Sequence, residues 1–103
     1  MSEQVAYDFE WDAVKAPANA RKHGVTFDQA ATVFQDALAL TAFDAEHSQQ
    51  EERWFTLGFD ASGALLAVSH TFQASTPARI RVRLISARPA TRRERQFYEN
   101  EPR

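Results

Sequence analysis

The spacing of apolar and polar residues in the first quarter of the chain predicts a strand followed by a helix. Residues 5–9 form a short strand candidate. Asp12 is suited to cap the helix that follows, which we expect to run to about His23. Gly24 then stands where a left-handed C-terminal cap favours a residue without a side chain.

Two further helices are predicted from capping boxes, in which a threonine and a residue three positions later bond each other's backbone N–H groups. Thr26 and Gln29 have this spacing, and so do Thr91 and Glu94, which follow Pro89 near the C-terminus. Apolar residues recur at the period of one helix face after the first box, at Phe27, Ala30, Ala31 and Phe34. The sequence therefore predicts a second short helix and a C-terminal helix.

Between these helices the pattern changes to the two-residue period of strands. Residues 37–43, 53–59, 64–72 and 79–86 are strand candidates, and residues 60–63 form a tight hairpin turn. Two of the strands have an apolar face that we expect to meet the helices, formed by Phe55, Leu57 and Phe59 and by Leu66, Val68, His70 and Phe72. The sequence predicts a single α+β domain over residues 1–103. Its antiparallel sheet has about four to five strands, with two N-terminal helices packed on it and a short C-terminal helix.

Composition changes this picture in two ways. The chain has no cysteine, no basic stretch before an apolar one at its N-terminus and no run of about 18 apolar residues, so we expect a cytoplasmic protein without a membrane segment. The net charge of -2 hides an asymmetry, because residues 79–95 hold seven basic side chains and one acidic one. Local basic concentration of this kind is the usual footprint of nucleic-acid binding.

The basic run begins in the last predicted strand. Side chains alternate in a strand, so Arg79, Arg81 and Arg83 share one face while Ile80, Val82 and Leu84 share the other. Successive arginines then lie about 6 to 7 Å apart, inside the Debye length of about 8 Å at physiological salt. They repel one another unless an anion lies among them, and composition alone allows any anion.

Two other groups of polar residues are candidates for the same anion. Arg92 and Arg93 fall in the first turn of the C-terminal helix, where free backbone amides bind phosphate, although they are equally explained as solvated charges. Four residues project from one face of the first helix and form either a second wall of the site or an ordinary solvent face: Lys15, Asn19, Lys22 and His23.

The three histidines have different expected roles. His70 alternates with core residues, so we expect it in the core. His47 lies in a polar loop near Glu51, Glu52 and Arg53, and is either an acid–base residue or a surface histidine, while His23 is placed to cap a helix. No histidine pair has metal-site spacing and no glycine-rich phosphate loop is present, so we expect neither a metal nor another cofactor.

With these residues laid out, the chain resembles the BrnT family of type II toxins, relatives of the RelE-like ribonuclease toxins. The resemblance rests on the order and spacing of short segments over nearly the full length. These segments are residues 9–12, Asn19 with residues 21–25 and Phe27, residues 47–48 and 51–53, residues 57–58 and 70–71, residues 83–88, residues 90–95 and Tyr98.

The resemblance implies a RelE-like fold and a metal-independent endoribonuclease that cleaves RNA and inhibits translation. It also implies a cognate BrnA-like ribbon-helix-helix antitoxin, with which the toxin represses its operon and meets DNA only indirectly. The family pattern has Glu-Arg after the His-Thr pair, whereas here Phe72 and Gln73 follow Thr71. One arginine expected in the basic groove is therefore replaced, and Arg79 and Arg81 are candidates to compensate.

RNA carries its own nucleophile, the 2′-hydroxyl, so its cleavage requires positioning, proton transfer and charge stabilisation. We expect Arg83 and Arg88 to hold the scissile phosphate and Lys22 or His47 to move protons, with Glu52 as an alternative base. The remaining RNA contacts are expected from Arg79, Arg81, Arg92 and Arg93, with Lys15 and Asn19 on the second wall. The alternative is a non-catalytic basic binding module that acts as antitoxin partner and operon corepressor.

Overall fold

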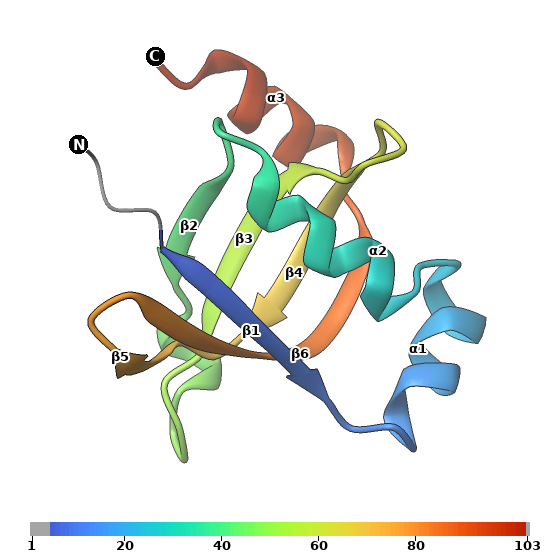
Figure 1. The fold of residues 1–103 in the computed structure, drawn as a ribbon. Helices are drawn as coiled ribbons and strands as arrows, with labels where there is room; N and C mark the ends of the chain where they lie inside the picture. Colours follow the sequence, from blue (N-terminus) through green and yellow to red (C-terminus); the bar gives the residue numbers. More distant parts are fainter. Residues whose placement is uncertain (1–4, 103) are drawn as a thin grey trace.

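A computed structural model describes residues 5–102. Its helices and longer strands follow one another in the order that the sequence predicts, with one additional strand, β5 (Figure 1). In chain order the elements are β1 (Ala6–Trp11), α1 (Lys15–His23), α2 (Phe27–Thr32), η1 (Val33–Gln35), β2 (Leu40–Phe43), η2 (Ala45–His47), β3 (Trp54–Phe59), β4 (Leu65–His70), β5 (Gln73–Thr76), β6 (Arg79–Pro89) and α3 (Arg92–Asn100).

The strands form one mixed sheet in the order β1-β6-β4-β3-β2, with β5 pairing with the first part of β6 on the edge opposite β1, the edge that β4 occupies further along β6. The α+β class is confirmed, and the pairs of β2, β3, β4 and β6 are antiparallel as expected. The pairing of β1 with β6 is parallel, which the sequence did not predict. This pairing joins the first and the last strand of the described chain at one edge of the sheet.

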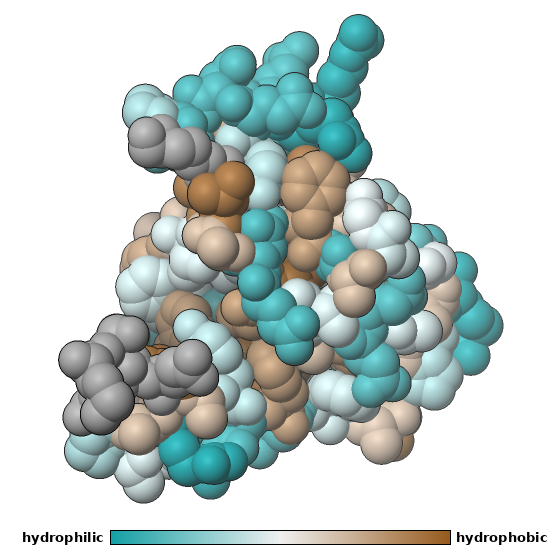
Figure 2. All heavy atoms as spheres, turned by 45° about the horizontal axis from the view of Figure 1, so that its top comes forward, coloured by the Kyte–Doolittle hydropathy of each residue, from teal (hydrophilic) through white to brown (hydrophobic). Residues whose placement is uncertain are grey.

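Apolar side chains are buried on both faces of the sheet, under different helices. Under α2, the core contains Phe27, Ala30 and Val33 with Leu66, Val68, Val82, Leu84 and Ala87. The opposite face carries α3, whose Tyr98 packs against Leu57, Leu65 and Ala67. The two apolar faces predicted from alternation therefore meet helices, but on opposite sides of the sheet. Figure 2 shows the hydrophilic surface of α3 above apolar side chains that reach the surface.

The predicted helix ends are confirmed except at the start of α1, where Val14 and not Asp12 is the N-cap. Gly24 has φ of 69°, and its N–H donates to the carbonyl of Ala20. Asp12 accepts the backbone N–H of Val14 at 2.8 Å, although regular helix starts only at Lys15. Both capping boxes are complete, at the start of α2 and of α3. The predicted turn at residues 60–63 is also present, closed by the bond from the Asp60 N–H to the Ala64 carbonyl.

A bulge in β6 sets the direction of its arginines. Ser86 pairs with Ser69, but Leu84 pairs with His70, so Ile85 is one extra residue on β6. Strict alternation would put Arg83 and Arg88 on opposite faces. With the bulge, both lie on the α3 face, because Leu84 and Ala87 are buried under α2. No helix within residues 5–102 is long and apolar enough to cross a membrane.

Candidate functional site

Carboxylates of the chain itself reduce the repulsion among the arginines of β6. Parallel pairing with β1 places Asp8 beside Arg81 and Glu10 beside Arg83, on the same side of the sheet. The Arg79 Nε donates to the Asp8 Oδ2 at 2.9 Å, and the Arg81 Nε lies 4.0 Å from the Glu10 Oε2. These pairs are exposed, so solvent screens them.

The hydrogen bond between Asp8 and Arg79 also shifts the pKa of both side chains. The hydrogen bond from the Arg79 guanidinium holds the pKa of the Asp8 carboxyl below its usual value. The same hydrogen bond raises the pKa of Arg79. Both groups therefore stay charged at neutral pH, and an incoming phosphate competes with the Asp8 carboxylate for Arg79.

Glu51 is the centre of the site, because it lines three adjoining hollows of about 280, 170 and 210 Å³. Its Oε1 accepts a hydrogen bond from the Arg83 guanidinium, and the Arg53 Nη2 lies 4.0 Å from the same oxygen. Arg83 comes from β6, and Arg53 directly precedes β3. One carboxylate thus lies between an arginine of β6 and an arginine just before β3, at a surface open to solvent.

The guanidinium of Arg53 has a buried donor without a hydrogen-bond acceptor among the described residues. This donor is the Nε. The side chain as a whole is 35% exposed, so the rest of the guanidinium remains accessible from the hollow. A buried N–H without a partner costs about 1 to 3 kcal/mol. An anion bound to the guanidinium would add hydrogen bonds that Arg53 lacks here.

His47 faces the same site with a defined ring orientation. Its Nδ1 donates to the Asp44 Oδ2 at 2.9 Å, and it lines the second hollow together with Glu51 and Arg53. An imidazole held by a carboxylate through Nδ1 keeps Nε2 available to accept or donate a proton. Lys15, at the start of α1, contributes an amine to the first hollow.

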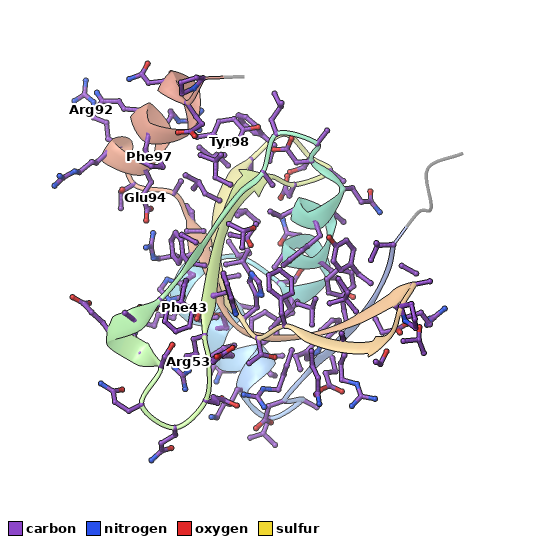
Figure 3. All side chains as sticks on the ribbon, turned by 90° about the vertical axis from the view of Figure 1, so that its left-hand side faces the viewer. Phe43, Arg53, Arg92, Glu94, Phe97 and Tyr98 are labelled. Carbon is purple, nitrogen blue, oxygen red and sulfur yellow. The ribbon has the colours of Figure 1, made fainter. Side chains whose placement is uncertain are left out.

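Five of the residues predicted for the site come together around Glu51, and they line the three hollows: Lys15, His47, Glu52, Arg81 and Arg83. Lys22, Arg92 and Arg93 line none of these hollows, and Arg79 lies at the far end of β6 with Asp8. Figure 3 shows Arg92 on α3 and Arg53 towards opposite ends of the sheet. The basic run therefore does not form one surface. Arg81 and Arg83 on β6 lie at the hollows around Glu51, whereas Arg92 and Arg93 on α3 lie away from them.

Arg88, predicted to hold the scissile phosphate, lines none of the three hollows and is paired with a carboxylate. Its guanidinium donates to both carboxylate oxygens of Glu94, at 2.7 and 3.0 Å, and lies 5.7 Å from the centre of the Phe55 ring. This hydrogen-bonded pair raises the pKa of Arg88 and lowers the pKa of Glu94. Arg88 therefore joins β6 to α3, and its donors face a carboxylate instead of the hollows.

Asn19, expected to contact RNA, makes hydrogen bonds within the fold. Its Nδ2 donates to the carbonyls of Val25 and Ala87, at 3.1 and 3.0 Å. The Ala87 N–H donates back to the Asn19 Oδ1 at 3.2 Å. All hydrogen-bonding groups of the side-chain amide are thus used to hold α1 against β6.

His70 lies in the core, as predicted. It is fully buried between Phe34 and Phe72, and burial lowers its pKa from 6.5 to about 4. Its Nδ1 donates to the Thr71 carbonyl, so Nε2 accepts the hydroxyl hydrogen of Thr56 at 2.6 Å. The ring is therefore neutral at physiological pH and inaccessible to substrate.

Sequence reasoning missed Glu51 and Arg53 as site residues. The available signal was their place in the segment of residues 51–53 that carries the family resemblance. Among residues 5–102, no group of three or more His, Asp or Glu side chains is arranged to hold a metal ion.

The family is established by comparison with known proteins. A family model described as "Ribonuclease toxin, BrnT, of type II toxin-antitoxin system" matches residues 11–94, which is most of the chain. The protein is therefore a ribonuclease toxin of a type II toxin-antitoxin system. More narrowly, the chain belongs to the BrnT family, so RNA is its substrate class and an antitoxin its partner.

A solved structure supports the fold. The crystal structure of the Brucella abortus ribonuclease toxin, BrnT, at 1.1 Å resolution, is 19% identical to this chain with a TM-score of 0.53. The match covers 88% of this chain and 100% of that one. At this identity the likeness shows a shared fold. No curated protein sequence matches the chain.

Proposed function

We propose that the chain is a metal-independent endoribonuclease that cleaves messenger RNA at the cluster of His47, Glu51, Arg53 and Arg83, and thereby inhibits translation. The observation that carries this proposal is the pair of arginines beside the Glu51 carboxylate at an open surface. Two guanidinium groups converging on one point can bind a phosphate bidentately. Membership of a ribonuclease toxin family supplies RNA as the phosphate's source.

The reaction needs no external nucleophile. The 2′-oxygen of RNA attacks the adjacent phosphorus, the bond from phosphorus to the 5′-oxygen of the next nucleotide breaks, and a cyclic 2′,3′-phosphate and a 5′-hydroxyl result. One proton leaves the 2′-hydroxyl and one joins the departing 5′-oxygen. A protein site therefore has to align the phosphate, transfer two protons and stabilise charge on the five-coordinate phosphorus.

Arg83 and Arg53 are the proposed phosphate ligands, and Glu51 positions both of them. His47 is the proposed proton carrier, because Asp44 orients its ring and it shares a hollow with Glu51 and Arg53. Glu52 remains the alternative base at the edge of the site. The Lys15 amine is placed to neutralise charge on the phosphate or the leaving oxygen.

Arg81 and Arg79 are proposed to bind flanking phosphates along β6. Gln73, at the position where the family pattern has arginine, pairs with Arg81 across β5 and β6. The guanidinium of Arg81 is therefore beside the replaced side chain and lines the same hollow. This neighbourhood supports compensation by Arg81 for the missing arginine.

The proposed partner is a BrnA-like ribbon-helix-helix antitoxin. The toxin would act in the cytoplasm and meet operator DNA only through that antitoxin. An acidic or apolar antitoxin surface is suited to cover the arginine cluster, because it is exposed and charged.

The test compares RNA cleavage by purified Arg83→Ala and Arg53→Ala variants with an Arg21→Ala control, whose exposed arginine on α1 lines none of the three hollows. We expect cleavage to persist in excess EDTA and the first two variants to lose about 100-fold or more in rate. Primer extension on cellular RNA after induction should show defined cut ends. Equal cleavage by all three folded variants would refute the site, and binding without cut ends would favour the non-catalytic module.

The proton carrier is tested separately with His47→Ala and Lys22→Ala. We expect His47→Ala to lower kcat by about 100-fold or more and to change the pH profile of the reaction. A loss confined to Lys22→Ala would transfer the role to that lysine and contradict the assignment to His47.

A further inference from the structure

An apolar groove of about 290 Å³ lies between β2 and α3, on the surface that Figure 3 faces. Its walls are Leu40 and Ala42 from β2, Phe55 and Leu57 from β3 and Phe97 from α3. Phe97 is 64% exposed, although it points from α3 towards β2. A further chain in the groove would bury the rest of this aromatic side chain, and burial of an aromatic ring is strongly favourable.

The groove adjoins an open sheet edge. β2 is the last strand in the sheet order, and among residues 5–102 it pairs only with β3. The Asp44 N–H bonds the Arg53 carbonyl, so the residues that bond β3 are Leu40, Ala42 and Asp44. The alternation of an antiparallel ladder then turns the N–H and C=O groups of Thr41 and Phe43 outward. These groups are a template for one more strand.

The two ends of β2 have different chemistry. Leu40, at its start, lines the groove beside α3. Phe43, at its end, is 47% exposed and leads directly into η2, which contains His47. In Figure 3 the labelled side chains follow this order, from Glu94 and Phe97 on α3 to Phe43 and then Arg53. A strand added along β2 would therefore run from the apolar groove to the edge of the ribonuclease site.

We propose that an extended segment of the antitoxin adds to the edge of β2, places apolar side chains in the groove between β2 and α3, and continues over the site at His47 and Arg53. The proposal rests on the antitoxin partner that family membership gives and on the proposed location of the ribonuclease site.

The charges near the two ends of β2 indicate which residues this antitoxin segment should contain. Arg93 lies one helical turn before Phe97, and no ion pair is recorded for its guanidinium among the described residues. At the other end of β2, Arg53 and Arg83 face the hollows. A segment with an apolar centre and carboxylates at both ends matches these arginines. The groove itself has apolar walls with Glu94 and Glu101 among its lining residues, so neither RNA phosphates nor the carboxylates of the segment match it, and those carboxylates must lie beyond its two ends.

The backbone part of the contact is tested with two substitutions at one position. Thr41→Pro removes the outward N–H, which an edge strand tolerates, and Thr41→Val keeps that N–H while removing the hydroxyl that bonds Thr56. The probe is the recombinant antitoxin from the neighbouring reading frame, titrated into each purified toxin by calorimetry. We expect Thr41→Pro to raise Kd about tenfold or more relative to Thr41→Val.

The groove is tested with Phe97→Glu, matched by Gln96→Glu on the same helix, where Gln96 is exposed and does not line the groove. Only Phe97→Glu should weaken antitoxin binding, again by about tenfold. Unfolding midpoints of all variants verify the fold. Unchanged Kd for both Thr41→Pro and Phe97→Glu would overturn the proposal. A wild-type homodimer in light scattering that Thr41→Pro abolishes would assign the edge to a second copy instead.

RNA cleavage by the free toxins separates this proposal from the proposed function. Thr41→Pro and Phe97→Glu should cut RNA at the wild-type rate but require more antitoxin for half-inhibition. If wild-type toxin fails to cut RNA, the proposed function fails, while the calorimetric comparison still decides the docking surface. Normal inhibition of both variants would contradict the docking surface even if cleavage occurs as proposed.

Discussion

Acidification should destabilise the fold through His70. The ring is fully buried, and burial lowers its pKa from 6.5 to about 4. In the unfolded chain the same ring takes up a proton near its usual pKa of about 6.5. Between these values the unfolded state binds more protons than the folded state. The free energy of unfolding therefore falls as pH decreases from about 6.5 to about 4.

The size of the effect follows from the shift. A difference of about 2.5 pKa units, at about 1.4 kcal/mol per unit, gives about 3.5 kcal/mol at full extent. No reduction for solvent screening applies, because no part of His70 is exposed. Small domains are stable by about 5 to 15 kcal/mol in total. A loss of this size should lower the urea concentration at the unfolding midpoint measurably. Much of the decrease should occur at pH values where most carboxylates are still ionised.

The assay is urea unfolding followed by circular dichroism at several pH values between about 7 and about 4. The comparison variant combines His70→Leu with Thr56→Val, so that the Thr56 hydroxyl does not lose its acceptor. The wild-type protein should lose about 3 kcal/mol more than the variant over this range. Parallel loss in both proteins would show that His70 does not titrate as its burial requires, and the reasoning would be wrong.

Two further changes follow from contacts in the sheet. Asp8→Asn should raise RNA affinity about twofold or more in a filter-binding titration, because Arg79 loses its internal competitor, whereas Asp28→Asn on α2 should not. Equal affinities would show that Asp8 does not compete with RNA. Gly58→Ala should lower the free energy of unfolding by about 1 to 3 kcal/mol in urea, since the new Cβ would lie 2.9 Å from the Val33 Cγ1. An unchanged midpoint would mean that this contact relaxes freely.

Local features of the fold were predictable because their causes are local. The left-handed cap at Gly24 and the capping boxes at Thr26 and Thr91 depend on residues within one helical turn. The core position of His70 followed from its alternation with apolar neighbours. The fold class followed from the succession of such elements.

The site was less predictable because it depends on pairings between distant residues. Nothing in the sequence near Arg83 indicates that Glu51 binds it, or that β1 pairs in parallel with β6 and brings Asp8 and Glu10 to the arginines. The bulge at Ile85 likewise follows from the register against β4. Charge pattern identified the basic strand, and tertiary contacts decided which arginines are available.

The position of β6 between two other strands has a consequence for the order in which the protein can fold during synthesis. β6 is the last strand of the described chain, yet it lies between β1 and β4. While the ribosome makes the first 78 residues, β1 has no neighbour and Glu51 has no Arg83 to hold. The site is therefore completed only after most of the chain has been made. Antitoxin already present in the cell can meet the toxin as soon as its sheet closes.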